Sequence, residues 1–176
     1  MLQRLFAIAV TFLVCACVSI PNQAGPEKQF KSHAGRFSIN YQKDGIAQRE
    51  QGGFEWKIQI DSPEEKAMQL SLLSPLGNTV VVIALNPSEP QINQRASFTS
   101  PNQTAFAPEL DSLMQNTLGW RLPLTALLPW LEKSPPKQMP ADWEIAVQSR
   151  HATDLPKLIT ANNERLNLSV RLVFEE

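Results

Sequence analysis

From residue 36 onward, apolar and polar residues alternate along much of the chain. A period of two predicts β-strands that bury one face, because successive side chains of a strand point to opposite sides. The clearest such runs cover residues 37–41, 54–61, 68–72, 143–147 and 166–174. Residues 80–85 are apolar on both faces, which predicts a strand at the centre of a sheet or one covered on both sides. Weaker strands are expected within 91–98 and at 156–161, the latter followed by a turn at Asn162-Asn163.

Residues 68–85 contain two apolar runs joined by a turn of unusual composition, Ser74-Pro75-Leu76-Gly77. Pro75 presets its own φ, and Ser74 and Gly77 suit the first and fourth positions of a type I turn. A type II turn centred on Leu76-Gly77 is the alternative. Both turns place Leu76 at the tip of a hairpin, although burying a leucine is worth roughly 1.5–3 kcal/mol. From these residues alone, Leu76 either folds back onto its own sheet or is held out to meet an apolar partner.

Between residues 108 and 131 the apolar residues change to helical spacing. One amphipathic helix is predicted to begin with Pro108 in its first turn and to end at Gly119. A second helix begins at Pro123, and Pro129 is expected to kink or break it, because proline removes an amide donor and clashes one turn back. The apolar stripe of this second helix consists of Leu124, Leu127, Leu128 and Leu131.

Many one-sided antiparallel strands with a helical insertion predict a mainly β (α+β) fold. The expected architecture is a single curved antiparallel sheet whose concave apolar face is covered by the helices. Two short helices are a modest cover for seven or more strands. The pattern leaves open whether the interior is hollow or packed.

The first 16 residues have the character of a bacterial lipoprotein signal peptide. They carry one Arg, no acidic residue, and an apolar run too short to span a bilayer as a mature helix. Residues 14–17 are similar to the lipobox, in which a cysteine becomes the diacylated N-terminus. Cys17 fits this role better than Cys15, because bulky Leu13 and Val14 precede Cys15. An ordinary signal peptide with incidental cysteines is the alternative.

Residues 17–34 are polar, with Pro21, Gly25 and Pro26, and predict a flexible tether between a lipid anchor and a domain at 35–176. By resemblance to lipoprotein sorting signals, Val18 and Ser19 after the cysteine predict the periplasmic face of the outer membrane. The formal net charge of the chain is −1, and no basic patch indicates nucleic acid.

The sequence lacks the motifs of common catalytic and metal sites. His33 and His151 are the only histidines, they lie in polar segments, and neither has metal-ligand spacing. No GxSxG motif, glycine-rich phosphate loop or nucleophilic cysteine is present. We therefore expect no enzyme activity, no metal and no cofactor.

Several segments together resemble the outer-membrane lipoprotein receptor family, LolB. They are GRFSINY (35–41), GGFEWKIQ (52–59), LLSPLGNTVVVIAL (72–85), LGWRLPLTALLPWL (118–131) and DWEIAV (142–147). The resemblance implies an incomplete antiparallel β-barrel with a short helical lid over an apolar cavity. It also implies that the protein accepts acylated lipoproteins from the periplasmic carrier LolA and inserts them into outer-membrane lipid. We expect it to act as a monomer.

The resemblance assigns roles to particular residues. Leu76, flanked by Pro75 and Gly77, corresponds to the protruding leucine that the family needs for membrane insertion. Acyl chains are expected to bind strand and lid residues, namely Phe37, Ile39, Trp56, Ile58, Met68, Leu70, Leu124, Leu127, Leu128 and Leu131. A lipid-anchored structural or assembly lipoprotein with a filled core is the alternative, and a lidded apolar cavity would distinguish the two.

Overall fold

The computed structural model describes residues 29–60, 66–132 and 140–176, and its strands form one nine-stranded antiparallel sheet. The strand order is β6-β5-β4-β3-β2-β1-β9-β8-β7, so β6 and β7 are the two edges of an open sheet. The strands are β1 (Phe30–Lys43), β2 (Ile46–Gln59), β3 (Met68–Leu73), β4 (Thr79–Leu85), β5 (Ala96–Ser100), β6 (Gln103–Ala107), β7 (Glu144–Arg150), β8 (Pro156–Asn163) and β9 (Leu168–Phe174). The expected mainly β fold is confirmed.

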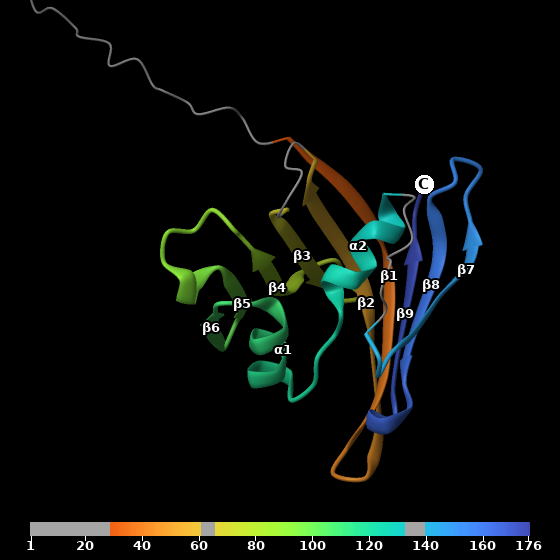
Figure 1. The fold of residues 1–176 in the computed structure, drawn as a ribbon. Coiled ribbons are helices and arrows are strands. Elements are labelled where there is room, and N and C mark those ends of the chain that lie inside the picture. Colours follow the sequence, from red (N-terminus) through yellow and green to blue (C-terminus); the bar gives the residue numbers. More distant parts are fainter. Residues whose placement is uncertain (1–28, 61–65, 133–139) are drawn as a thin grey trace, which may run out of the picture.

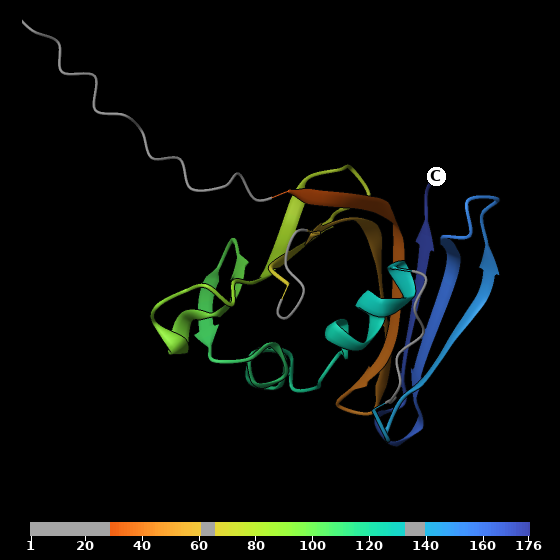
Figure 2. The same cartoon turned by 45° about the horizontal axis from the view of Figure 1, so that its top comes forward.

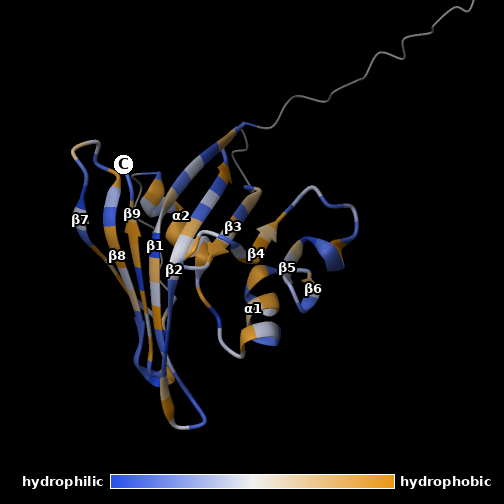
Figure 3. Ribbon diagram, turned by 180° about the vertical axis from the view of Figure 1, so that it is seen from behind, coloured by the Kyte–Doolittle hydropathy of each residue, from blue (hydrophilic) through white to orange (hydrophobic). Residues whose placement is uncertain are grey.

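The sheet curves around two short helices, α1 (Leu110–Leu118) and α2 (Leu124–Leu131), which lie on its concave side (Figures 1 and 2). Short 3-10 helices, η1 (Ile92–Gln94) and η2 (Glu164–Leu166), complete the described elements. Seen from behind, the strands alternate between hydrophobic and hydrophilic residues (Figure 3). No helix among the described residues is both long enough and apolar enough to span a membrane.

The core follows the alternation that the sequence displays. On β2, Phe54, Trp56 and Ile58 are buried, and the intervening Glu55 and Lys57 are half-buried and form an ion pair on the other face. The strand β4 is an interior strand between β3 and β5, but it is the third strand from the β6 edge and not at the centre of the sheet. Nor is it covered on both sides, since only its Ile83 is buried.

The hairpin between β3 and β4 has the turn that the sequence favours. The amide of Gly77 donates to the carbonyl of Ser74, with φ of +84° at Gly77 and a negative φ at Leu76. This hydrogen bond belongs to a type I turn over 74–77, and the left-handed Gly77 then directs the chain into β4. Leu76 is 88% exposed, so it does not fold back onto its own sheet.

The helices match the expected segments, with two differences at proline. Pro108 precedes the N-cap residue Glu109 instead of lying in the first turn of α1, and the helix ends at Gly119 as expected. The helix α2 is not broken at Pro129 but continues to Leu131. Pro129 lies in the last turn of α2, so little helix follows it. This last turn closes with the amide of Glu132 donating to the carbonyl of Pro129.

Several strands differ from the sequence-based expectation, and β9 begins at Leu168 because Leu166 belongs to η2. The turn predicted at Asn162-Asn163 is wrong, because β8 continues through Asn163, whose side chain caps η2 by accepting from the amide of Leu166. The strand β6 was missed, because its short QTAFA run has little periodicity and pairs only with β5. Finally, β1 begins at Phe30, so residues 30–34, assigned above to the tether, pair with β2. The signal peptide and Cys17 lie outside the described residues.

One glycine on β2 permits a close approach between neighbouring strands. A Cβ at Gly52 would lie 2.0 Å from the carbonyl oxygen of Leu73, at the end of β3. Gly52 also lies opposite Phe37 on β1, whose ring would be 3.1 Å from the same Cβ. The backbone of β3 cannot yield as a flexible side chain would, so a larger residue must displace the end of the strand.

We expect Gly52→Ala to lower the free energy of unfolding by about 1–3 kcal/mol, the usual effect of forcing atoms into a packed site. Gly53→Ala is a matched control, because its Cβ would meet nothing closer than 3.4 Å. That variant should stay within about 0.5 kcal/mol of wild type. Urea unfolding followed by tryptophan fluorescence measures both, and equal stability of the two variants would contradict the steric account.

Candidate functional site

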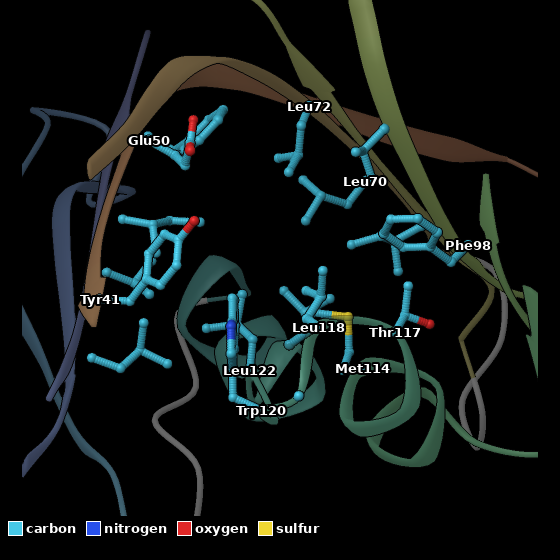
Figure 4. A pocket seen from close by; sticks show the side chains of 18 of the residues that line it. Tyr41, Glu50, Leu70, Leu72, Phe98, Met114, Thr117, Leu118, Trp120 and Leu122 are labelled. Carbon is cyan, nitrogen blue, oxygen red and sulfur yellow. The ribbon is translucent and has the colours of Figure 1, made fainter. Parts of the chain in front are cut away.

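An apolar cavity of about 630 Å³ lies between the concave face of the sheet and the two helices. One wall comes from β2, β1 and β9, which are neighbours in the sheet, and the other wall comes from β3, β4 and β5. The C-terminal part of α1, the following loop and the start of α2 close the cavity from below in Figure 4. A volume in this range is typical of small-ligand pockets.

The structure brings half of the predicted cavity residues into this site. Phe37, Ile39, Trp56, Leu70 and Leu124 line the cavity. The other five do not line it and are reassigned to packing: Ile58, Met68, Leu127, Leu128 and Leu131. Four of these five are buried core residues, and Leu128 packs against the core from a half-buried position. Periodicity identifies a shared apolar face, but it cannot tell where along that face packing ends and open space begins.

Several lining residues were not singled out from the sequence. Phe98 of β5 and Met114 of α1 belong to apolar runs whose periodicity was visible, so pattern alone could have suggested them. Leu122 lies in the loop between the helices, where no period exists to reveal an inward-facing side chain. Trp120 of the same loop, a residue type that suits either a lipid site or a plain core, also lines the cavity. In Figure 4 both side chains lie below Leu70 and Leu72.

Exposed apolar residues mark the mouth of the cavity. Val80, Leu118 and Leu166 all line the cavity and are nevertheless exposed, which places them where it meets solvent. Leu76 lies four residues before Val80, at the tip of the hairpin that leads into this rim. Exposed apolar side chains that surround the opening of an apolar cavity favour an interaction with apolar material.

The ionisable groups of the structure do not form a reactive centre at the cavity. Among the described residues, no group of His, Cys, Asp and Glu could hold a metal ion. Burial, and secondarily the positive charge of Lys31, lowers the pKa of His33, which packs edge-on against Phe174 and does not line the cavity. A ring nitrogen of His151 lies 3.0 Å from the backbone oxygen of Phe174, a structural contact near the C-terminus.

An open curved sheet that holds an apolar cavity under two helices defines a binding protein for apolar ligands. Comparison with known proteins supports this class of protein. Residues 29–149 match the family described as outer membrane lipoprotein LolB. The chain belongs to the LolB family, and it is thus a lipoprotein receptor of the outer membrane and not an enzyme.

Three curated relatives illustrate the similarity. The outer-membrane lipoproteins LolB of Cupriavidus pinatubonensis and Cupriavidus necator are each 34% identical to this chain, over 85% of its length and over 69% and 73% of their own. LolB of Ralstonia nicotianae is 37% identical over 69% of this chain and 53% of its own length. Family membership confirms the resemblance found in the sequence, and with it the outer-membrane location expected from Val18 and Ser19.

Proposed function

We propose that this receptor accepts lipoproteins from the periplasmic carrier LolA, holds their acyl chains in the apolar cavity, and inserts them into the outer membrane. The observation that carries the proposal is the cavity of about 630 Å³, one of whose lining strands, β4, follows the turn that holds the exposed Leu76. A structural lipoprotein with a filled core, the alternative considered from the sequence, has no use for such a space.

The energetics of the cargo require a sheltered route. Each methylene of an acyl chain that is exposed to water costs about 0.8 kcal/mol, so several long chains together would cost tens of kcal/mol. An apolar cavity removes this cost for the part of the chains that it encloses, without a chemical energy source. Direction then follows from relative affinity, with the carrier binding more weakly than the receptor and the receptor more weakly than the membrane.

Cargo binding can be tested with Leu72, which lines the cavity from β3, and Leu73, the adjacent residue on the other face. Both leucines are half-buried. Leu72→Glu should weaken binding of a fluorescent diacylglyceryl-cysteinyl peptide by about tenfold or more, because bound acyl chains would desolvate the carboxylate at a cost of roughly 1–3 kcal/mol.

Leu73→Glu introduces the same charge one residue along the strand and should leave the dissociation constant within about twofold of wild type. Fluorescence anisotropy measures both variants, and urea unfolding checks that each is folded. Equal weakening by the two substitutions would argue against acyl binding in this cavity.

Leu76 is proposed to act in delivery. Its side chain is at a turn tip and 88% exposed, so Leu76→Glu removes no core contact and should leave the melting temperature near that of wild type. A carboxylate at this tip must be desolvated to enter the apolar layer of a membrane. The variant should take a lipoprotein from LolA normally but fail to transfer it to liposomes.

Ile92→Glu is the matched control for delivery. Ile92 is also exposed, at 58%, but it lies in η1, beyond the opposite end of β4 from the turn that holds Leu76. A liposome transfer assay with radiolabelled cargo compares the two variants. Transfer by Leu76→Glu at the wild-type rate would refute the membrane role of this residue.

The lipid anchor is proposed to be on Cys17, after removal of residues 1–16, with residues from Cys17 to the start of β1 as the tether and the following sheet as the receptor domain. Metabolic labelling with a palmitate analogue should mark wild type and Cys15→Ser but not Cys17→Ser, because cleavage removes Cys15. Labelling of Cys17→Ser at the wild-type level would overturn the assignment.

A further inference from the structure

One acidic residue lies on the wall of the otherwise mainly apolar cavity. Glu50 of β2 lines the cavity and is paired directly with Ile39 of β1, which also lines it. Directly opposed residues of an antiparallel pair point to the same face, so Glu50 belongs to the concave side of the sheet. Figure 4 shows Glu50 above Tyr41 on the wall formed by β1 and β2.

Glu50 lies at the level where the cavity meets solvent. Along β2, Trp56 and Phe54 are fully buried, whereas Glu50 is exposed. Between them, at the pair Gly53 and Leu73, the pairing of β2 with β3 ends, whereas β2 stays paired with β1, and β1 with β9, past the level of Glu50. An acyl chain that is bound with its tail against Trp56 would therefore have its polar end near Glu50.

The negative charge of Glu50 has no close cation to neutralise it within the described ranges. No ion pair there includes Glu50. Lys43 also lines the cavity, but it is paired with Ile46, four residues further toward the tip of the hairpin than the pair of Ile39 and Glu50. A ligand group that enters from the tip of the hairpin would thus pass the ammonium group of Lys43 before it reaches the carboxylate of Glu50, which lies deeper.

We propose that Glu50 is a specificity-determining residue that disfavours phosphate-bearing lipids in the cavity. This inference rests on the proposed acyl-binding function. A phospholipid and an acylated N-terminal cysteine both carry acyl chains on glycerol, and they differ in the group that follows. The phospholipid places a phosphate anion near the mouth, which Glu50 repels. The lipoprotein places uncharged thioether and amide groups there, and an amide N–H can donate to the carboxylate.

A charge that selects among ligands suits this receptor, because the mouth of its cavity also has the exposed apolar side chains of Val80, Leu118 and Leu166. A cavity that opens beside a membrane meets far more phospholipid than cargo, and apolar walls alone cannot distinguish two ligands with identical chains. Charge at the mouth can distinguish them. Because Glu50 is exposed, water and salt screen its field, and the effect on affinity is severalfold.

The test measures competition against the fluorescent diacylglyceryl-cysteinyl peptide bound to the full chain in nonionic detergent micelles. The competitors are dioleoyl phosphatidylglycerol and dioleoylglycerol, which share acyl chains and differ by the anionic headgroup. The ratio of their half-displacing concentrations reports discrimination against phosphate. Glu50→Gln should lower this ratio about two- to fivefold, the range expected of exposed charges, and Glu50→Lys should lower it further.

Glu55→Gln is the matched control, because Glu55 is on the same strand but on the opposite face, where it pairs with Lys57. This variant should keep the wild-type ratio, and raising the salt concentration should shrink the difference between wild type and Glu50→Gln. If Glu50→Gln binds the peptide normally and keeps the wild-type ratio, the proposed role of Glu50 is refuted, while the proposed acyl-binding function still stands. Failure of wild type to bind the peptide overturns the proposed function and this inference together.

Discussion

The structure depends on a mismatch between a large apolar surface and a small cover. The concave face of a nine-stranded sheet must be shielded from water, and helices of nine and eight residues are the cover that the described chain supplies. At the far end of α2 the two layers meet, and Leu127 and Leu131 are fully buried. Around the end of α1, the following loop and the start of α2 they separate, and the face stays apolar without being filled. The cavity is the space that remains.

Unequal strand lengths determine what surrounds the mouth of this cavity. The strands β1 and β2 have 14 residues each, whereas β3 and β4 have six and seven. The longer pair therefore extends past the shorter one and carries Glu50 and Tyr41 beyond the level at which β3 ends. On the other side, the shorter hairpin ends in the exposed Leu76. The mouth consequently has a polar side and an apolar side.

This arrangement suits transfer by affinity alone. A filled core would give more stability than an open cavity, because empty space forfeits dispersion contacts along its lining. The chain retains the cavity and an exposed leucine, both of which are unfavourable for an isolated domain. In the proposed function each becomes favourable when an acyl chain or a membrane is present, so the groups that weaken the free protein are the ones that this proposed function uses.

The sequence by itself determined the local features. Alternation along Phe54–Ile58 specified a buried strand face, the turn around Pro75 placed Leu76 at a hairpin tip, and Gly119 ended α1, because each depends on neighbouring residues. Only the tertiary structure decided that Trp56 borders the cavity while Leu127 is packed away from it, and that Glu50 shares a wall with Ile39. These facts depend on the curvature of the sheet and on which strands run past their neighbours. Sheet curvature and relative strand length are properties of all the strands together. The hydrophobic period of a single segment therefore cannot predict them.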